Sequence, residues 1–404
     1  MKFIHLADAH LDSPFRGLSF LPKSEYQEIK DAANESFTRI IDLAVREAVD
    51  LVLIAGDTFD SNKPSPASQV FFKKEIDRLT AAGIQVVMIF GNHDYMRKSD
   101  LLVKEGPHFT LLGDGEQIER RDFTTKSGFA YNVTGFSYAH NHIEEDLLMQ
   151  FPEKAPSFTI GLMHAGQAAG QNNVYAPFTL ERMRELGYDY FALGHIHARQ
   201  TLLAKPLVVY PGNIQGRDIG ELGAKGCYLV EVDEESRQSQ LTFCPTSQIV
   251  WEQANLVLDA PLSASDLADK IAATLRAHES AGVKTFVSLK LTGSEYLTPD
   301  QLTFWQDPAA WEEASSRANS ARLVDFRVKV RGLVQLSSTD QAALDRAKVE
   351  ILSEEKIKQL AASWIKKDPE ARRLAENPEF LAQVKELVSV KLADRLQDIG
   401  GSGE

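Results

Sequence analysis

Cysteine and long apolar runs are scarce in this chain of 404 residues. Its only cysteines, Cys227 and Cys244, lie outside all the polar motifs, so we expect reduced thiols, with a disulfide between them as the alternative. No segment is apolar over the length that a membrane-spanning helix needs. The apolar run at the N-terminus is short and already contains Asp8, so we expect no signal peptide. These features predict a protein of the cytoplasm.

Positive charge is scarce as well. The chain has 44 Lys and Arg residues against 57 Asp and Glu residues, which gives a net charge of −13. Proteins that coat nucleic acid regardless of its sequence contact the phosphates through Lys and Arg. The composition therefore disfavours tight coating of nucleic acid by this chain acting alone.

What the chain does have is a set of five short apolar segments, each of which ends in metal-binding side chains. Their content of Val, Ile, Leu and Phe is typical of strands that are buried on both faces of a sheet. In layered α/β folds, ligands gather outside the carboxyl ends of the strands. The segments are residues 3–10, 50–57, 84–94, 158–165 and 190–197.

The side chains at these strand ends are imidazoles, carboxylates and one carboxamide. Five such ends on one rim indicate a hydrolytic site with two metal ions. Asp8 and His10 are two residues apart, so an extended backbone directs both to the same side. Asp57 has two carboxylate oxygens and can bridge two ions, which a histidine cannot do. The complete set is Asp8, His10, Asp57, Asn92, His93, Asp94, His164, His195 and His197.

The same residues form motifs that resemble a known family. D-x-H, G-D-x-x-D, G-N-H-D, a single His after a strand and G-H-x-H follow one another like the ordered signature of calcineurin-like metallophosphoesterases. The strings HLADAHLDSPFRGL, GDTFDSNKPSP and YPGNIQGRD resemble SbcD-type DNA repair exonuclease subunits, above all their bacterial YhaO-type branch. The resemblance covers roughly residues 1–220. It implies an α/β fold of four layers, an α/β/β/α sandwich.

The resemblance also implies a role for each ligand. The first metal ion would be held by Asp8, His10, Asp57 and His197, and the second by Asp57, Asn92, His164 and His195. Mn²⁺ is the expected activator, and Fe, Zn or Mg would also suit nitrogen and oxygen ligands. His93 would stay off both ions and donate a proton to the leaving oxygen, with Asp94 as a candidate for orienting its ring. A metal-bound water would be the nucleophile.

Four further residues near these motifs are candidates for a role at the site. Arg16 and Arg217 each lie in a loop that directly follows metal ligands, so we expect them to bind the substrate. Asp60 stands where some family members carry His, and it either tunes the site or orders the following loop. Asn213 stands where many relatives carry Ser, which leaves the substrate contacts of that loop open.

Three other histidines are expected to be structural. His140 and His142 imitate an H-x-H motif, but acidic residues follow them and no buried strand of the same kind precedes them. We therefore expect a surface loop or the start of a helix there. His5 lies inside the first strand and is expected to pack in the core.

The chain is predicted to have three parts. Residues 1–247 alternate strands with helices, including helices at 35–49 and 67–82, and form the expected catalytic domain. Residues 248–336 are expected to form a small α+β capping domain. Its predicted strands are 251–258, 283–292 and 323–333, and its predicted helices are 264–281 and 299–317. In the last strand, Arg327, Lys329 and Arg331 alternate with apolar residues and form either a DNA-facing rim or a solvated face.

The third part, residues 337–404, is expected to be a helical tail. It has two apolar stripes at helical spacing, separated by breaks at Pro369 and Pro378. Burial of these stripes against the chain itself and burial against a partner are equally compatible with the pattern. The stripes are Ile357, Leu360, Ala361, Trp364 and Ile365, and Phe380, Leu381, Val384, Leu387 and Val388.

The resemblance implies a metal-dependent DNA nuclease of double-strand-break repair, an exonuclease on double strands in the 3′→5′ direction and an endonuclease on single strands. It also implies that the tail binds an SMC-like coiled-coil ATPase (SbcC-like). A second copy of the chain is another candidate partner. The alternatives are a phosphodiesterase or phosphatase for small molecules, and a DNA-end-binding scaffold for the ATPase.

Overall fold

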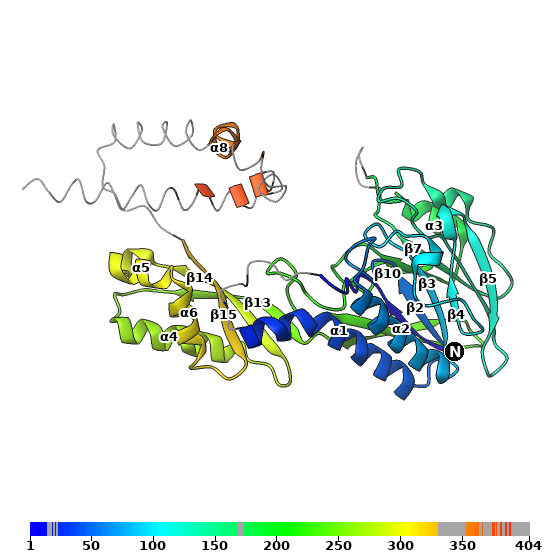
Figure 1. Cartoon of the computed structure of the whole chain (residues 1–404), viewed down its shortest axis with the longest axis horizontal. Helices are drawn as coiled ribbons and strands as arrows, with labels where there is room; N and C mark the ends of the chain where they lie inside the picture. Colours follow the sequence, from blue (N-terminus) through cyan, green and yellow to red (C-terminus); the bar gives the residue numbers. More distant parts are fainter. Residues whose placement is uncertain are drawn as a thin grey trace, which may run out of the picture. The chain divides into compact units, whose positions relative to one another are not determined.

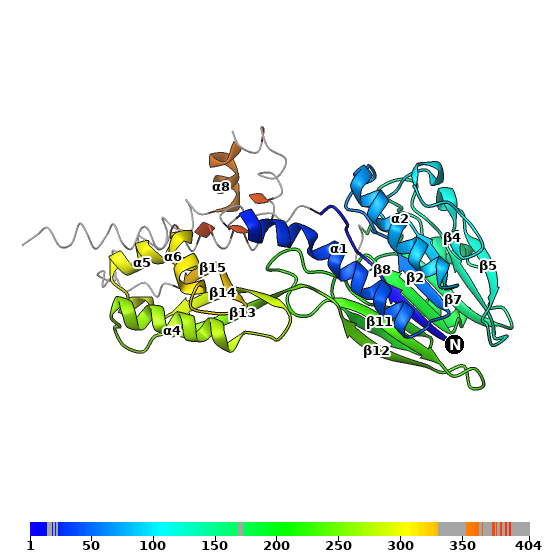
Figure 2. The same cartoon turned by 60° about the horizontal axis from the view of Figure 1, so that its bottom comes forward.

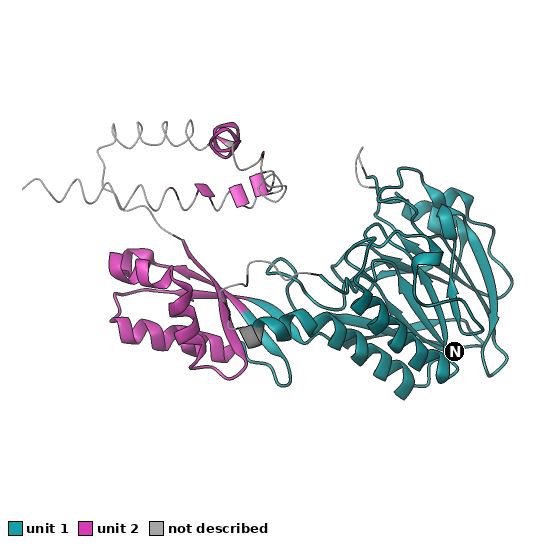
Figure 3. Ribbon diagram, viewed as in Figure 1, with its two compact units in different colours: residues 1–252, 278–286 teal, residues 253–277, 287–404 magenta. Residues whose placement is uncertain are grey.

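The computed structural model describes the chain except for residues 14–17, 19–20, 22, 169–172, 330–352 and most of 363–404. It divides into two compact units, residues 1–252 with 278–286, and residues 253–277 with 287–404 (Figure 3). The first division lies close to the boundary expected after residue 247. The boundary expected after residue 336 lies outside the described residues, so the three-part division stays a prediction.

Unit 1 contains two six-stranded sheets. In the first sheet, four neighbouring strands are parallel, and two more strands continue the sheet at one end, each antiparallel to the strand before it. Its order is β12 (Ser239–Pro245), β11 (Gly226–Val232), β1 (Lys2–Leu6), β2 (Leu51–Ala55), β3 (Gln85–Ile89) and β4 (Phe109–Leu111). The carboxyl ends of β1, β2 and β3 therefore lie at the same edge of the sheet.

In the second sheet the four middle strands are parallel, and the outer strands β5 and β9 are antiparallel to their neighbours. Its order is β5 (Glu119–Thr124), β6 (Ala130–Gly135), β7 (Phe158–His164), β8 (Tyr190–Gly194), β10 (Leu207–Tyr210) and β9 (Gln200–Ala204). Short 3₁₀ helices lie at Lys98–Asp100, Asp114–Glu116 and Leu147–Gln150 in the connecting segments.

The sheets pack face to face, and helices cover their outer faces (Figures 1 and 2). Phe3 and Leu53 of the first sheet meet Ile160 of the second in the core between them. The opposite face of the first sheet packs against α1 (Lys23–Arg46) and α2 (Pro66–Ala81). The opposite face of the second packs against α3 (Leu180–Leu186). This confirms the four-layer α/β/β/α sandwich.

The observed helices refine the predicted ones. Helix α2 matches its prediction to within one residue. Its start is fixed by the side chain of Ser65, which accepts a hydrogen bond from the backbone N–H of Ser68. Helix α1 begins at Lys23 rather than at residue 35. Its first turns are polar and their apolar spacing is weak, so the start was missed.

In unit 2 and the segments joined to it, a three-stranded sheet has the order β13 (Ile249–Val257), β14 (Lys284–Thr292) and β15 (Ala321–Lys329). One apolar cluster joins its strands to α4 (Ala264–Ala277), α5 (Pro299–Trp305) and α6 (Pro308–Ser315). A 3₁₀ turn at Ser294–Tyr296 precedes α5. The single helix predicted over 299–317 is wrong. Pro308 starts a new helix there, and the side chain of Asp307 caps it.

The strand predicted at 323–333 is described only as far as Lys329. Of its basic row, Arg327 pairs with Asp325 at 2.6 Å, whereas the side chain of Lys329 and all of Arg331 lie outside the described residues. In the tail, α8 (Glu354–Leu360) carries Ile357 and Leu360, whereas Trp364, Ile365 and Leu387 are not described. Among the described residues, no helix is both long and apolar enough to cross a membrane.

Candidate metal centre

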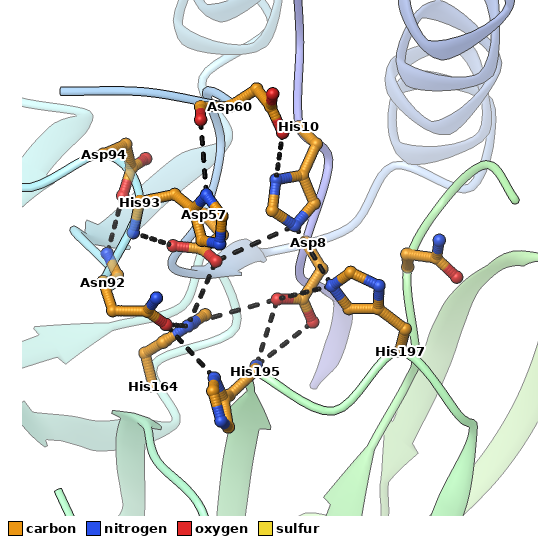
Figure 4. Close-up of polar contacts among 12 residues, drawn as sticks. Asp8, His10, Asp57, Asp60, Asn92, His93, Asp94, His164, His195 and His197 are labelled. Carbon is orange, nitrogen blue, oxygen red and sulfur yellow. Dashed lines mark hydrogen bonds and ion pairs between the residues drawn. The ribbon is translucent and has the colours of Figure 1, made fainter. Parts of the chain in front are cut away.

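The five strand ends converge in unit 1. Asp8, Asp57 and Asn92 follow β1, β2 and β3 of the first sheet. His164 is the last residue of β7, and His195 comes directly after β8 of the second sheet. Together with His10 and His197, these residues make up the seven predicted ligands. All seven lie in one cluster (Figure 4). The site therefore straddles the carboxyl ends of both sheets.

The ligands form two groups. In the first group, Nε2 of His10 lies 3.1 Å from Nε2 of His197, and the latter lies 4.0 Å from Oδ1 of Asp8. In the second group, Oδ1 of Asn92 lies 3.0 Å from Nε2 of His164 and 3.1 Å from Nδ1 of His195. His195 thus presents Nδ1 to its group, whereas His10 and His197 meet through Nε2.

Asp57 lies between the two groups. Its Oδ2 is 3.7 Å from Nε2 of His10 and 3.4 Å from Nε2 of His164. Its Oδ1 accepts a hydrogen bond of 2.9 Å from the backbone N–H of His93. Only Oδ2 therefore faces both groups, and this oxygen is the one that could bridge two ions.

The donor set fits divalent metal ions. The ligand atoms of Asp8, His10 and His197 lie within 4.8 Å of one another, as do those of Asp8, Asp57 and His164. These are carboxylate oxygens and imidazole nitrogens, without a thiolate, and they suit Mn, Fe, Zn or Mg. A positive charge among these carboxylates and imidazole lone pairs, from a proton or a metal ion, would offset their mutual repulsion. A third set of the same kind consists of His10, Asp60 and His93.

The backbone is strained at four of the ligands. Asp8, His10 and Asp57 have φ values of 51°, 44° and 50°, and His195 has a φ of 100°. Non-glycine residues rarely adopt such angles, and each costs of order 1–3 kcal/mol. Strain of this kind persists only where the surrounding structure enforces it, and four of the seven predicted ligands carry it.

Two glycines let the ligand loops approach each other. A Cβ at Gly194 would lie 1.9 Å from the carbonyl oxygen of Ala55 and 2.9 Å from Nδ1 of His164. A Cβ at Gly91 would lie 2.2 Å from Oδ1 of Asp57. Any larger residue would push the strand ends of the two sheets apart, and the site depends on their contact.

The pKa values show how strongly the carboxylates attract a cation. Burial alone would lower the pKa of His164, but the negative charges of Asp57 and Asp8 outweigh it and raise that pKa to about 9. Burial and the neighbouring His164 lower the pKa of His195 to about 3. The carboxylates around His164 thus favour a positive charge there, which a proton on its ring can supply. A divalent ion would compete with that proton for the site.

Three of the four predicted ligand histidines have a polar partner near Nδ1, on the side that faces away from the ligand group. Nδ1 of His164 bonds the carbonyl oxygen of Ala55 at 2.9 Å, and Nδ1 of His10 lies 3.1 Å from Oδ1 of Asp60. Nδ1 of His197 bonds Oε1 of Glu221 at 2.6 Å. Burial would raise the pKa of Glu221, but the His197 bond and the nearby Arg217 lower it to about 2.

His195 is held differently, by a ring. The aromatic ring of Tyr175 lies over it with the ring centroids 4.5 Å apart, and His142 lies 5.5 Å from Tyr175. Sequence reasoning missed both Glu221 and Tyr175, because neither follows a buried strand. For Glu221, a weak signal existed, since it lies just beyond the YPGNIQGRD string.

His93 lies beside the ligands at the exposed side of the cluster. Its ring is perpendicular to that of His10, with centroids 5.0 Å apart, and its Nδ1 is 3.3 Å from the carbonyl oxygen of Asp60. Asp94 was expected to orient this ring. Both of its oxygens instead accept backbone N–H groups, from Gly91 at 2.6 Å and Thr58 at 2.7 Å, so we assign Asp94 to the loop backbone.

The other candidates divide. Arg16 lies outside the described residues. Arg217 is near the site, where it donates to Oδ1 of Asp60 at 3.0 Å, and its role in binding a substrate stays a prediction. Asn213 is buried and donates to Oε2 of Glu221 at 2.7 Å.

The remaining histidines and both cysteines lie outside the ligand cluster. His140 and His142 are exposed on a connecting segment, and His5 is fully buried between the sheets. Cys227 and Cys244 are free thiols.

Comparison with known proteins places the chain in a family. The family model described as "Calcineurin-like phosphoesterase" matches residues 1–199. The uncharacterized metallophosphoesterase YhaO of Bacillus subtilis (strain 168) is 36% identical over 297 residues, which cover 73% of this chain and 72% of that protein. The chain belongs to the calcineurin-like metallophosphoesterase family, and it is accordingly a hydrolase of phosphoester bonds.

More distant relatives have a named role. The DNA double-strand break repair protein Mre11 of Sulfurisphaera tokodaii is 26% identical over 210 residues, which cover 50% of each chain. The protein of the same name from Aeropyrum pernix is 29% identical over 246 residues, 56% of this chain and 57% of that protein. The chain thus spans little more than half the length of these two relatives.

Proposed function

We propose that this phosphoesterase is a Mn²⁺-dependent DNA nuclease of double-strand-break repair, with 3′→5′ exonuclease action on double strands and endonuclease action on single strands. The single observation that carries the proposal is the complete ligand set with His93 beside it, in a chain whose relatives include proteins named for DNA double-strand break repair. Such a substrate would place the activity in the cytoplasm.

The chain's residues divide the work at the phosphate. One ion would be held by Asp8, His10 and His197, and the other ion by Asn92, His164 and His195. Asp57 would bind both ions through Oδ2. When bound, the two ions would supply Lewis acidity, which activates a water and offsets the charge that develops on the phosphate.

His93 is the proposed proton donor to the leaving oxygen. Its ring is exposed, so a substrate can reach it, and it stands 5.0 Å from the ring of His10. Its backbone N–H is fixed by Oδ1 of Asp57, which ties its position to the bridging ligand. A donor in this place needs no bond to either ion.

The test is an assay of the purified protein with Mn²⁺ on three substrates: linear duplex DNA, single-stranded circles and a chromogenic phosphodiester. We expect cleavage of both DNA substrates, with mononucleotides released from the 3′ ends of the duplex. Cleavage of the chromogenic substrate alone would favour a small-molecule phosphodiesterase, which the net charge of −13 also suits. Binding of DNA ends without any cleavage would favour the scaffold.

We further propose that the helical tail binds an SMC-like coiled-coil ATPase. Leu360 of α8 supports this, since 74% of its surface is exposed within the described residues. Removing residues 337–404 should abolish co-purification with the ATPase and preserve Mn²⁺-dependent cleavage of the chromogenic phosphodiester. Full retention of the ATPase by the truncated chain would place the contact elsewhere.

A further inference from the structure

Two carboxylates stand behind the first ligand group, on the far side of its two imidazoles. Oε1 of Glu221 is 2.6 Å from Nδ1 of His197, and Oδ1 of Asp60 is 3.1 Å from Nδ1 of His10. The Nε2 atoms of the same two rings face each other at 3.1 Å. The ring of His197 is therefore hydrogen-bonded to a carboxylate behind it, the ring of His10 has a carboxylate close to its Nδ1, and both rings turn Nε2 toward the position of the first ion.

Glu221 is fixed from several sides. It lies in the segment between β10 and β11, and 14% of its side chain is exposed. Its Oε2 accepts hydrogen bonds of 2.7 Å from the side chain of Asn213 and of 2.7 Å from the backbone N–H of Arg217. These bonds leave Oε1 for His197, so the carboxylate is built to hold that ring.

Arg217 connects the two carboxylates. Its Nη1 donates to Oδ1 of Asp60 at 3.0 Å, and its Nε lies 3.7 Å from Oε1 of Glu221. The guanidinium thus neutralises two acidic groups that would otherwise repel each other behind the site. It also fixes their separation, because its donors have a rigid planar arrangement.

The chemical consequence concerns the tautomer of each ring. A neutral imidazole has one N–H donor and one lone pair. A carboxylate at Nδ1 holds the proton there, which leaves the lone pair on Nε2 for a cation. His164 obtains the same result from a backbone carbonyl, at Ala55. The first group differs from His164 because its two rings, His10 and His197, both contact carboxylates that Arg217 links into one ionic network.

We propose that Glu221, Arg217 and Asp60 form a positioning network that orients His10 and His197 as a pair and so sets the affinity of the first metal position. The inference rests on the dinuclear metal site of the proposed function. It assigns Glu221 a role in metal binding without direct contact to the ion. It also gives Arg217 a role that does not require it to touch the substrate.

The test is a titration of the full chain with Mn²⁺, in which binding is measured by calorimetry and by electron paramagnetic resonance. In Glu221→Gln the shape is kept and the charge is lost. We expect one of two Mn²⁺ ions to bind about 10- to 100-fold more weakly. At intermediate Mn²⁺ the spectrum of a coupled pair should give way to that of an isolated ion. Asp218→Asn, an exposed change in the same segment, is the matched control and should bind like the wild type.

Two variants, each combined with Glu221→Gln, show which of the two metal positions is affected. In Asn92→Ala, which impairs the second group, Glu221→Gln should weaken the remaining ion. In His197→Ala, where the partner of Glu221 is gone, the same change should have no further effect. Arg217→Gln combined with Glu221→Gln should cost less than the sum of the single effects.

The outcomes are distinct. Wild-type affinity for both ions in Glu221→Gln would overturn the inference. Equal weakening of both ions with a lower Tm of the metal-free protein would also overturn it, because Glu221 would then support the fold. A wild-type chain that binds no Mn²⁺ pair would instead refute the proposed function.

Discussion

Acid should destabilise this protein in part through a single buried histidine, His5, which lies on β1 between the sheets. Its Nδ1 bonds the hydroxyl of Tyr190 at 2.9 Å, and its Nε2 bonds the carbonyl oxygen of Leu193 at 3.2 Å. Burial lowers the pKa of His5 from 6.5 to about 3, although the bond to Leu193 opposes the shift. The folded protein therefore keeps this ring neutral in conditions where the unfolded chain protonates it.

The sign and the size follow from this difference. The contribution of His5 to stability is complete above the unfolded pKa of 6.5 and is lost progressively as the pH falls toward 3. Each pH unit within this window costs about 1.4 kcal/mol. At about pH 5 the free energy of unfolding should be lower by about 2 kcal/mol on account of His5 alone.

The assay is urea unfolding of the wild type and of His5→Gln at several values between about pH 7.5 and pH 5. Glutamine does not titrate in this range, and its amide can still meet the hydroxyl of Tyr190. Other groups titrate equally in both proteins, so the difference between them isolates His5. The variant should be less stable than the wild type near neutral pH. At pH 5 the difference between their free energies of unfolding should be smaller by about 2 kcal/mol. A gap that stays constant with pH would refute the reasoning.

Three further predictions concern the ligand site. Asp57→Asn should reduce the occupancy of both ions in metal analysis, because Oδ2 faces both groups; an unchanged metal count would reject the bridging role. His93→Ala should keep both ions and lower kcat for a phosphodiester by about 10²- to 10⁴-fold, so a near wild-type rate would show that another group donates the proton. Gly194→Ala should lower both the Tm and the metal content, since its Cβ would lie 1.9 Å from a carbonyl oxygen. Gly106→Ala, whose Cβ would meet no atom within 4 Å, is the control and should change neither.

The convergence of the seven predicted ligands could be foreseen because these residues follow a rule that is visible in sequence. Each sits at or just past the end of an apolar run, and parallel strands bring such ends to one edge. The two groups that they form were not visible in the same way. That Asn92 meets His164 and His195 depends on the packing of one sheet on the other. The order of motifs indicated it only through the resemblance to a family.

Contacts between side chains and backbone were harder to predict. Asp94 follows His93 directly, and adjacency suggested that it would orient that ring. In the fold, the N–H groups of Gly91, in its own loop, and of Thr58, in the segment after β2, donate to its two oxygens. Pro308 shows the opposite case, since a proline after Asp307 is a strong local signal for a new helix. The helix predicted over 299–317 ran through this signal.

The second layer of the site has no sequence rule at all. Glu221 lies 24 residues after His197 and in a segment without regular structure, yet its Oε1 lies 2.6 Å from Nδ1 of this predicted ligand. Any of the chain's 57 acidic residues could have filled that place on composition alone. What selects Glu221 is the fold of its own segment, where Asn213 and the backbone of Arg217 hold one carboxylate oxygen and direct the other to the ring. The places of the predicted ligands thus follow from where strands end, whereas the partner behind each imidazole is set by contacts that only the folded chain creates.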